Sequence, residues 1–290
     1  MRELFSDKEF LSRLDHLVFL SKRIHSGRKG GVRRGRNCGY GLEYADHREY
    51  SNGDDMRYID WDLYRRSGKL YTKLFMEDED ININILLDRS RSMDYGAPSK
   101  FEYALKLSAS LGYVGLSLWD RVGAGYFSND IDGLIPPRRG KGQLFSYLEF
   151  LCSFKAENST DLNNSLENFA EKVKTPGLVI ILSDFFDEKG YERGLNYLLF
   201  KKFEVHVIQV LCSKETAPEF RGKVRLRNIE ENQEVDLNAD ETILRSYQIE
   251  LEKYNSSLSN FCGSKGILYQ QVLTDTPFDE LLTEYFKQQL

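Results

Sequence analysis

The sequence contains few cysteines, and their spacing excludes two classes of protein. Only four occur in 290 residues, at Cys38, Cys152, Cys212 and Cys262, and none belongs to a Cys-x-x-Cys pair. This spacing excludes a disulfide-rich secreted scaffold and a cysteine zinc site. It predicts reduced, partly buried thiols in a cytosolic protein.

Long hydrophobic runs are also missing. The longest uncharged stretch covers residues 107–119, between Lys106 and Asp120, whereas a membrane-spanning helix needs about 18 apolar residues. The first residues, Met1-Arg-Glu-Leu-Phe-Ser-Asp, lack the basic end and apolar run of a signal peptide. We therefore expect a cytoplasmic protein with no membrane span.

Two catalytic motifs do not occur. No Gly-x-x-x-x-Gly-Lys-Ser/Thr loop is present, which argues against an NTPase, and no Gly-x-Ser-x-Gly is present, which argues against a serine hydrolase. The net charge of −5 does not indicate a general nucleic-acid binder. With 41% hydrophobic and 29% charged residues, the chain has the composition of a globular protein with a sizeable core.

The most informative stretch is residues 81–93. Alternating and then continuous branched apolar residues from Ile81 to Leu87 predict a buried strand, which leads directly into Asp88-x-Ser90-x-Ser92. A carboxylate and two hydroxyls in one tight loop are hard oxygen ligands, which suit magnesium or manganese better than zinc or copper. The same serines are also suited to capping the helix that follows.

Strand and helix patterns alternate along the rest of the chain. Strands are expected at about 122–127, 131–135 (ended by Pro136-Pro137), 178–182, 204–211 and 267–272, with a hairpin over 224–227 and 234–237. Helices are expected at about 100–118, 141–153, from 161 onward, 189–201, 242–261 and 277–288. This alternation predicts an α/β fold with a doubly wound, mainly parallel sheet.

Ligands of such a sheet bind beyond the carboxyl ends of the strands, where the strand order reverses. Asp88 ends the first buried strand and Asp184 ends the strongly apolar strand at 178–182, so a doubly wound order places them side by side. Thr160, beside Ser159, precedes a helix just upstream of the second strand. The predicted metal site therefore comprises Asp88, Ser90, Ser92, Thr160 and Asp184.

The part before the sheet has three segments. A capping box at 6–9 starts an amphipathic helix over 6–25, whose apolar face we expect to pack on the main body. Residues 27–41 are basic and glycine-rich, and residues 39–80 are polar, aromatic and acidic. We expect residues 1–80 to form this helix, the loop and a lobe, and residues 81–290 to form the α/β domain. The basic run 22–36 keeps nucleic-acid binding open as an alternative, although it lacks aromatic residues for stacking.

The five candidate residues resemble the metal-ion-dependent adhesion site of von Willebrand factor type A domains. The resemblance covers about 88–290 and implies that Ser90, Ser92 and Thr160 contact the metal directly. It implies that Asp88 and Asp184 act mostly through water and that a partner's carboxylate completes the shell. Asp184 is followed by Phe185, where many of these domains have glycine.

A second resemblance extends further upstream. Gly41-Leu-Glu-Tyr, Arg48-Glu-Tyr, Gly53-Asp-Asp-Met-Arg-Tyr-Ile-Asp-Trp and Lys73-Leu-Phe, followed by Asp88-x-Ser-x-Ser-Met, are similar to the bacterial family called domain of unknown function fifty-eight. This resemblance implies a partner or adaptor of a MoxR-type AAA+ ATPase in a chaperone-like system.

The expected function is thus a non-enzymatic interaction module that uses magnesium, or manganese, to bind a partner's carboxylate. A magnesium-dependent phosphohydrolase with Asp88 as nucleophile or ligand remains the alternative. Asp-x-Ser-x-Ser lacks the second carboxylate, two residues on, that such enzymes commonly use.

Overall fold

The structure of the protein is a computed structural model that describes residues 12–18, 38–39, 43–76, 81–157, 159–218, 222–227 and 234–288. The chain divides into two compact units, one of residues 1–25 and 81–290 and one of residues 26–80. The larger unit includes the predicted N-terminal helix. The described part of that segment, residues 12–18, is helical.

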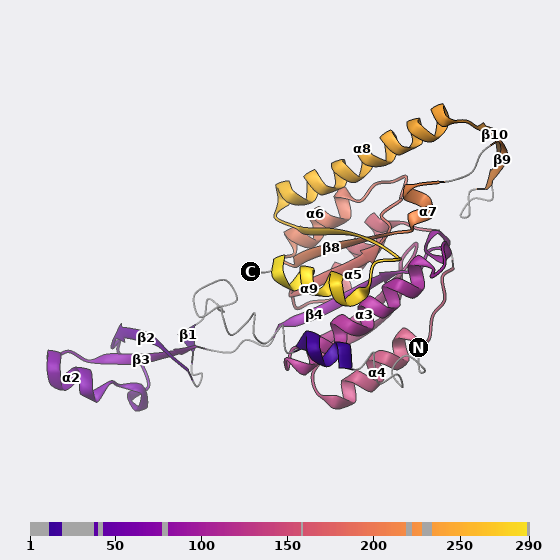
Figure 1. Ribbon diagram of the computed structural model, residues 1–290. Coiled ribbons are helices and arrows are strands. Elements are labelled where there is room, and N and C mark those ends of the chain that lie inside the picture. The colour runs from indigo at the N-terminus through magenta and orange to yellow at the C-terminus, as the bar shows by residue number, and fades with distance from the viewer. Residues whose placement is uncertain are drawn as a thin grey trace. The chain divides into compact units, whose positions relative to one another are not determined.

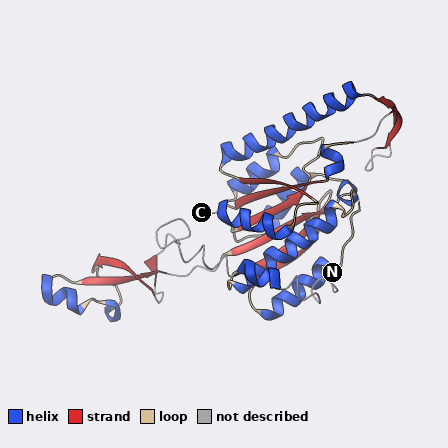
Figure 2. Ribbon diagram, viewed as in Figure 1, coloured by secondary structure: helices blue, strands red, loops and turns tan. Residues whose placement is uncertain are grey.

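The larger unit is an α/β domain, which confirms the predicted class (Figures 1 and 2). Its six-stranded sheet has the order β11-β8-β7-β4-β5-β6, and every pair except β5–β6 is parallel. The strands are β4 (Asn82–Asp88), β5 (Arg121–Phe127), β6 (Ile131–Arg138), β7 (Leu178–Ser183), β8 (Glu204–Leu211) and β11 (Leu268–Leu273). The order reverses between β4 and β7, which pair directly, as a doubly wound sheet requires.

Helices cover both faces of the sheet (Figure 2). On one face, apolar side chains of the helix at 12–18, α3, α4 and α9 join one core cluster. On the other face, α5, α6 and α8 contribute to a second cluster. These helices are α3 (Lys100–Ser117), α4 (Lys141–Leu151), α5 (Leu162–Lys172), α6 (Glu192–Phe200), α8 (Glu241–Lys265) and α9 (Phe278–Gln288). Short elements are η3 (Arg91–Asp94), α7 (Ser213–Thr216) and the antiparallel hairpin of β9 (Gly222–Arg227) and β10 (Glu234–Ala239), which was predicted.

The N-terminal helix packs on its own domain, as expected. Leu14 and Leu17 are fully buried in the cluster that contains α3 and α9. Arg13 pairs with Asp279 of α9 at 3.6 Å, and the Tyr113 hydroxyl donates to Asp15 at 2.7 Å. The rest of the predicted helix, 6–11 and 19–25, lies outside the described residues.

One predicted strand end is wrong. The strand at 131–135 was expected to stop at Pro136-Pro137, but β6 continues to Arg138. Proline lacks the N–H that a central strand donates to its neighbour, but β6 is an edge strand with one neighbour, so it tolerates both prolines.

The smaller unit contains a three-stranded antiparallel sheet of order β1-β3-β2, with β1 (Cys38–Gly39), β2 (Glu43–Glu49) and β3 (Tyr71–Met76). Between β2 and β3 lie η2 (Met56–Tyr58) and α2 (Trp61–Ser67). Asp60 caps α2 by accepting from two backbone amides, and Gly68 ends the helix at φ 72°. The basic glycine-rich run falls largely outside the described residues.

Candidate functional site

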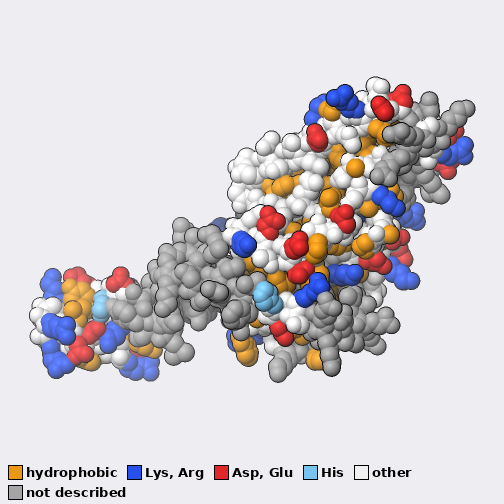
Figure 3. Space-filling view, in the orientation of Figure 1, with side chains coloured by type: hydrophobic (Ala, Val, Ile, Leu, Met, Phe, Trp, Pro, Cys, Tyr) orange, Lys and Arg blue, Asp and Glu red, His pale blue; other side chains and the backbone are white. Residues whose placement is uncertain are grey.

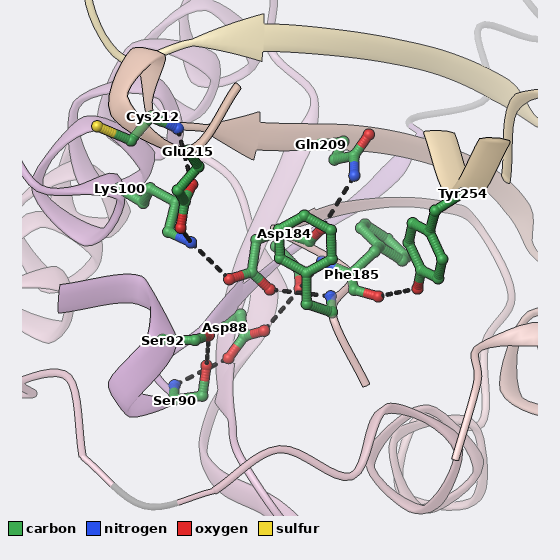
Figure 4. A network of polar contacts seen from close by, with 12 residues as sticks. Asp88, Ser90, Ser92, Lys100, Asp184, Phe185, Gln209, Cys212, Glu215 and Tyr254 are labelled. Carbon is green, nitrogen blue, oxygen red and sulfur yellow. Dashed lines mark hydrogen bonds and ion pairs between the residues drawn. The ribbon is translucent and has the colours of Figure 1, made fainter. Parts of the chain in front are cut away.

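Asp88 and Asp184 lie at the carboxyl ends of two neighbouring parallel strands, where the sequence predicted them. Asp88 is the last residue of β4, and Asp184 directly follows β7. Both side chains are almost completely buried. Ser183 Oγ, beside Asp184, donates to Asp88 Oδ2 at 2.6 Å, so the two strand ends are joined by a direct hydrogen bond (Figure 4).

The loop after β4 brings two hydroxyls to Asp88. The backbone N–H of Ser90 donates to Asp88 Oδ1 at 2.8 Å, and the Ser90 and Ser92 hydroxyl oxygens are 3.0 Å apart. Ser90 is fully buried and has no side-chain bond to the η3 backbone. The two hydroxyls are therefore grouped beside the carboxylate, and capping does not account for them.

The environment of Asp88 disfavours its negative charge. Burial and then the charge of Asp184 raise the pKa of Asp88 from 3.8 to about 7, against the opposing effect of hydrogen bonds from Ser183 and Ser90. Ser183 and Ser90 donate hydrogen bonds to Asp88, and no salt bridge to it is seen among the described residues. A cation beside Asp88 would remove this cost, so the donor set fits a metal that prefers oxygen ligands.

Asp184, unlike Asp88, has a cationic partner in the described part of the chain. Lys100 Nζ donates to Asp184 Oδ2 at 2.7 Å and to Glu215 Oε1 at 2.6 Å, and the lysine side chain is 1% exposed. Burial works against the charge of Lys100, but Asp184 and Glu215 more than offset it and raise the pKa of the ammonium group. Burial raises the pKa of Glu215, and Lys100 opposes that rise.

The turn after β7 is fixed by several hydrogen bonds. Phe186 N–H donates to Asp184 Oδ1 at 3.1 Å, and Gln209 Nε2 donates to the Asp184 carbonyl at 3.0 Å. Phe185 has φ 62°, in the left-handed region that favours glycine, although its side chain is fully buried. Its carbonyl accepts from the Tyr254 hydroxyl of α8. A glycine at this position would meet no such strain, and here burial of the ring and these hydrogen bonds hold the conformation.

Thr160 is the fifth predicted ligand, and its loop does reach this edge of the sheet. Glu157 N–H donates to the Arg89 carbonyl at 2.6 Å, and Asp161 N–H donates to the Ser128 carbonyl at 3.0 Å. The helix expected from about 161 begins at Leu162, with Asp161 as its N-cap. Thr160 is partly exposed, and its role as a ligand stays a prediction. The neighbouring Ser159 hydroxyl donates to Asn129 at 2.9 Å.

Arg89 does not add charge to the serine loop. Its guanidinium pairs with Asp132 at 3.5 Å and Glu157 at 3.1 Å, and it lies over the Phe154 ring at 5.2 Å. Arg91 is exposed. The arginine that follows Asp88 is thus neutralised by its own acidic partners.

Sequence reasoning missed Lys100 and Glu215. Lys100 is the first residue of α3, where a helix dipole favours an acidic residue, so its position was one available signal. Glu215 lies in a capping box with Cys212, which explains it as a local structural residue. The contact between Lys100 and Glu215 could not be predicted from the sequence, because the two residues are far apart in the chain.

Other site types receive no support from the described part of the chain. No group of three His, Cys, Asp or Glu side chains able to hold a metal was found there, so the candidate depends on two carboxylates with hydroxyls. None of the described helices is long and apolar enough to cross a membrane. Figure 3 shows basic and acidic side chains interspersed on the drawn face of the larger unit.

Comparison with known proteins identifies one family. The model of the family described as "Protein of unknown function DUF58" matches residues 46–256. Uncharacterized protein Mb1516 of Mycobacterium bovis and uncharacterized protein Rv1480 of Mycobacterium tuberculosis are each 23% identical over 235 residues, which cover 79% of this chain and 74% of each relative.

Solved structures show weaker similarity. The conserved hypothetical protein BatB from Bacteroides thetaiotaomicron is 16% identical with a TM-score of 0.45, covering 72% of this chain and 98% of that one. An aerotolerance-related membrane protein from Bacteroides fragilis is 17% identical with a TM-score of 0.47, covering 72% and 97%.

Proposed function

The chain belongs to the DUF58 family of proteins of unknown function, and from this premise and the geometry at the sheet edge we propose a non-enzymatic interaction module. In this proposal its larger unit is a von Willebrand factor type A-like domain that binds Mg²⁺, or Mn²⁺, and receives a carboxylate of a partner protein. The observation that carries the proposal is Asp88, which is fully buried, is hydrogen-bonded to Ser90 and Ser183, and forms no salt bridge within the described part of the chain.

The residues of such a site have different roles. Ser90 and Ser92 offer neutral hydroxyl oxygens, and Asp88 and Asp184 offer charge, directly or through water. The hydrogen bonds from Ser183 and Ser90 orient the Asp88 carboxylate before any ligand arrives. Bound metal supplies an open coordination position for an anionic oxygen. A site whose direct protein ligands are the neutral hydroxyls holds magnesium weakly, which leaves part of the affinity to the partner.

The phosphohydrolase alternative is less well supported. A nucleophilic Asp88 would have to reach a phosphoryl group, yet its side chain is 0% exposed and both of its oxygens accept hydrogen bonds. Turnover of a phosphate ester with magnesium that disappears in Asp88→Asn would favour the enzyme and contradict the interaction module.

Metal binding is the direct test. We expect Asp88→Ala to weaken Mn²⁺ binding, measured by electron paramagnetic resonance of free Mn²⁺, by about 10- to 100-fold, as loss of a residue that supports a metal typically does. The matched control is Asp130→Ala, an acid at the same sheet edge whose side chain is 53% exposed. Equal binding by wild type and Asp88→Ala would overturn the proposed site.

The partner requires a second experiment. Wild type and Asp88→Ala are each used as bait in native extract, with Mg²⁺ and with EDTA. The family resemblance makes a MoxR-type AAA+ ATPase the expected partner, retained only by wild type with Mg²⁺. Retention of that ATPase in all four conditions would place its binding surface elsewhere in the chain.

A further inference from the structure

Lys100 occupies a position that is unfavourable for a lysine. It is the first residue of the 18-residue helix α3, next to the Ser99 N-cap, where the helix dipole repels positive charge. Its side chain is 1% exposed, so it also loses the hydration of its ammonium group. A lysine in such a place needs compensating contacts, and Lys100 has two carboxylate partners, Asp184 and Glu215, and lies over the Phe186 ring at 5.7 Å.

The charges of this network do not balance. Asp88, Asp184 and Glu215 supply three carboxylates, whose side chains are at most 17% exposed. Lys100 supplies an ammonium group that is bonded to Asp184 and Glu215 but not to Asp88. With all four groups ionised the formal charge is −2, and this deficit matches one divalent cation.

We propose that Lys100 determines the specificity of this site by cancelling one of its three negative charges. This inference rests on the proposed function, because it concerns the same metal and the same ligand oxygen. With Lys100 in place, a site loaded with a divalent ion is electroneutral and accepts an anionic ligand. Without Lys100 the loaded site keeps one negative charge and repels a carboxylate.

The same charge count gives opposite effects for the two partners of one ion pair. Lys100→Met leaves three negative charges, so a divalent ion binds more tightly. Glu215→Gln leaves one, so the ion binds more weakly. The double variant restores −2 and returns the affinity toward wild type. A purely structural ion pair predicts that both single variants weaken the site, since each leaves a buried charge unpaired.

The experiment measures the dissociation constant of Mn²⁺ for these four proteins by electron paramagnetic resonance, with thermal unfolding by circular dichroism as the folding check. We expect Lys100→Met to bind about tenfold more tightly and Glu215→Gln about tenfold more weakly, because each variant changes the charge of this buried network by one unit. We expect the double variant to lie within about threefold of wild type. The double variant removes the Lys100 ammonium group and the Glu215 carboxylate together, so it tests the charge count even if a single variant does not fold.

Acetate, a small carboxylate, tests the claim that Lys100 allows the metal-loaded site to accept an anionic ligand. Loss of water from bound Mn²⁺, followed by water-proton relaxation, should occur at lower acetate concentration in wild type than in Lys100→Met. Identical acetate responses would overturn the claim about ligand charge.

The outcomes separate this inference from the proposed function. Wild-type binding of Mn²⁺ with both single variants unchanged, or both weakened, overturns the role of Lys100 and leaves the metal site standing. A double variant that binds far from wild type also overturns the charge count. No Mn²⁺ binding by any of the four proteins overturns both proposals.

Discussion

Asp88 is the residue whose ionisation should control metal-free stability. Its pKa is raised to about 7 by burial and by Asp184, from an ordinary value of 3.8 that applies to the unfolded chain. Between these two values the folded protein holds a proton that the unfolded chain releases. The contribution of Asp88 to the free energy of unfolding should therefore be largest below about pH 4. It should decrease as the pH rises from about 4 to about 7, and it should be lost at higher pH.

Urea unfolding in EDTA at about pH 5, 6, 7 and 8 measures this dependence. In Asp88→Asn the fall over this range should be clearly smaller, because asparagine does not titrate. The control is Asp130→Asn, whose exposed carboxyl has a lowered pKa through hydrogen bonding to Ile131 and should leave the dependence unchanged. Parallel pH profiles for wild type and Asp88→Asn would show that Asp88 is ionised throughout.

At the scale of elements, β4 buries an amide side chain in its middle. Asn84 is 0% exposed in the middle of this central strand, and neither its amide nitrogen nor its amide oxygen has a hydrogen-bond partner in the structure. A buried amide left unpaired costs about 1–3 kcal/mol, and valine suits a central strand. Asn84→Val should raise the free energy of unfolding by about 1 kcal/mol.

Equilibrium urea unfolding at one pH checks this expectation. Asn82→Val is the matched control, because Asn82 begins the same strand and is only partly buried. It should change stability much less. A loss of stability in Asn84→Val would mean that the Asn84 amide binds a water molecule or another group in the folded protein.

Most elements, and the pair of aspartates, could be predicted because each depends on local pattern. Apolar runs identified β4 and β7, and the rule for doubly wound sheets then placed Asp88 beside Asp184. The extent of β6 could not be predicted, because only its edge position explains why it tolerates Pro136 and Pro137. The Lys100–Glu215 pair was also missed, since an ion pair 115 residues apart leaves no periodic signal.

At the scale of the whole molecule, the described parts of the two units differ in how many side chains they bury. Among residues 46–73, whose burial is described, only Ile59 and Thr72 are buried. The larger unit has two extensive clusters, one of which includes Leu14 and Leu17 from the N-terminal helix. Since the segment 46–73 buries few side chains, it gains little hydrophobic stabilisation, and we expect it to open independently and more often.

Reciprocal truncations test this independence. Ile59→Ala should speed amide hydrogen exchange in the peptides from 43–76 and leave β4 and β5 unchanged. Leu17→Ala should do the reverse, and should cost the larger unit about 2–5 kcal/mol, as buried leucine truncations do. Hydrogen exchange with mass spectrometry reads both units in one sample. If either variant accelerates exchange in both units to the same extent, the chain unfolds as one cooperative body, and the N-terminal helix and the segment 26–80 are energetically part of a single domain.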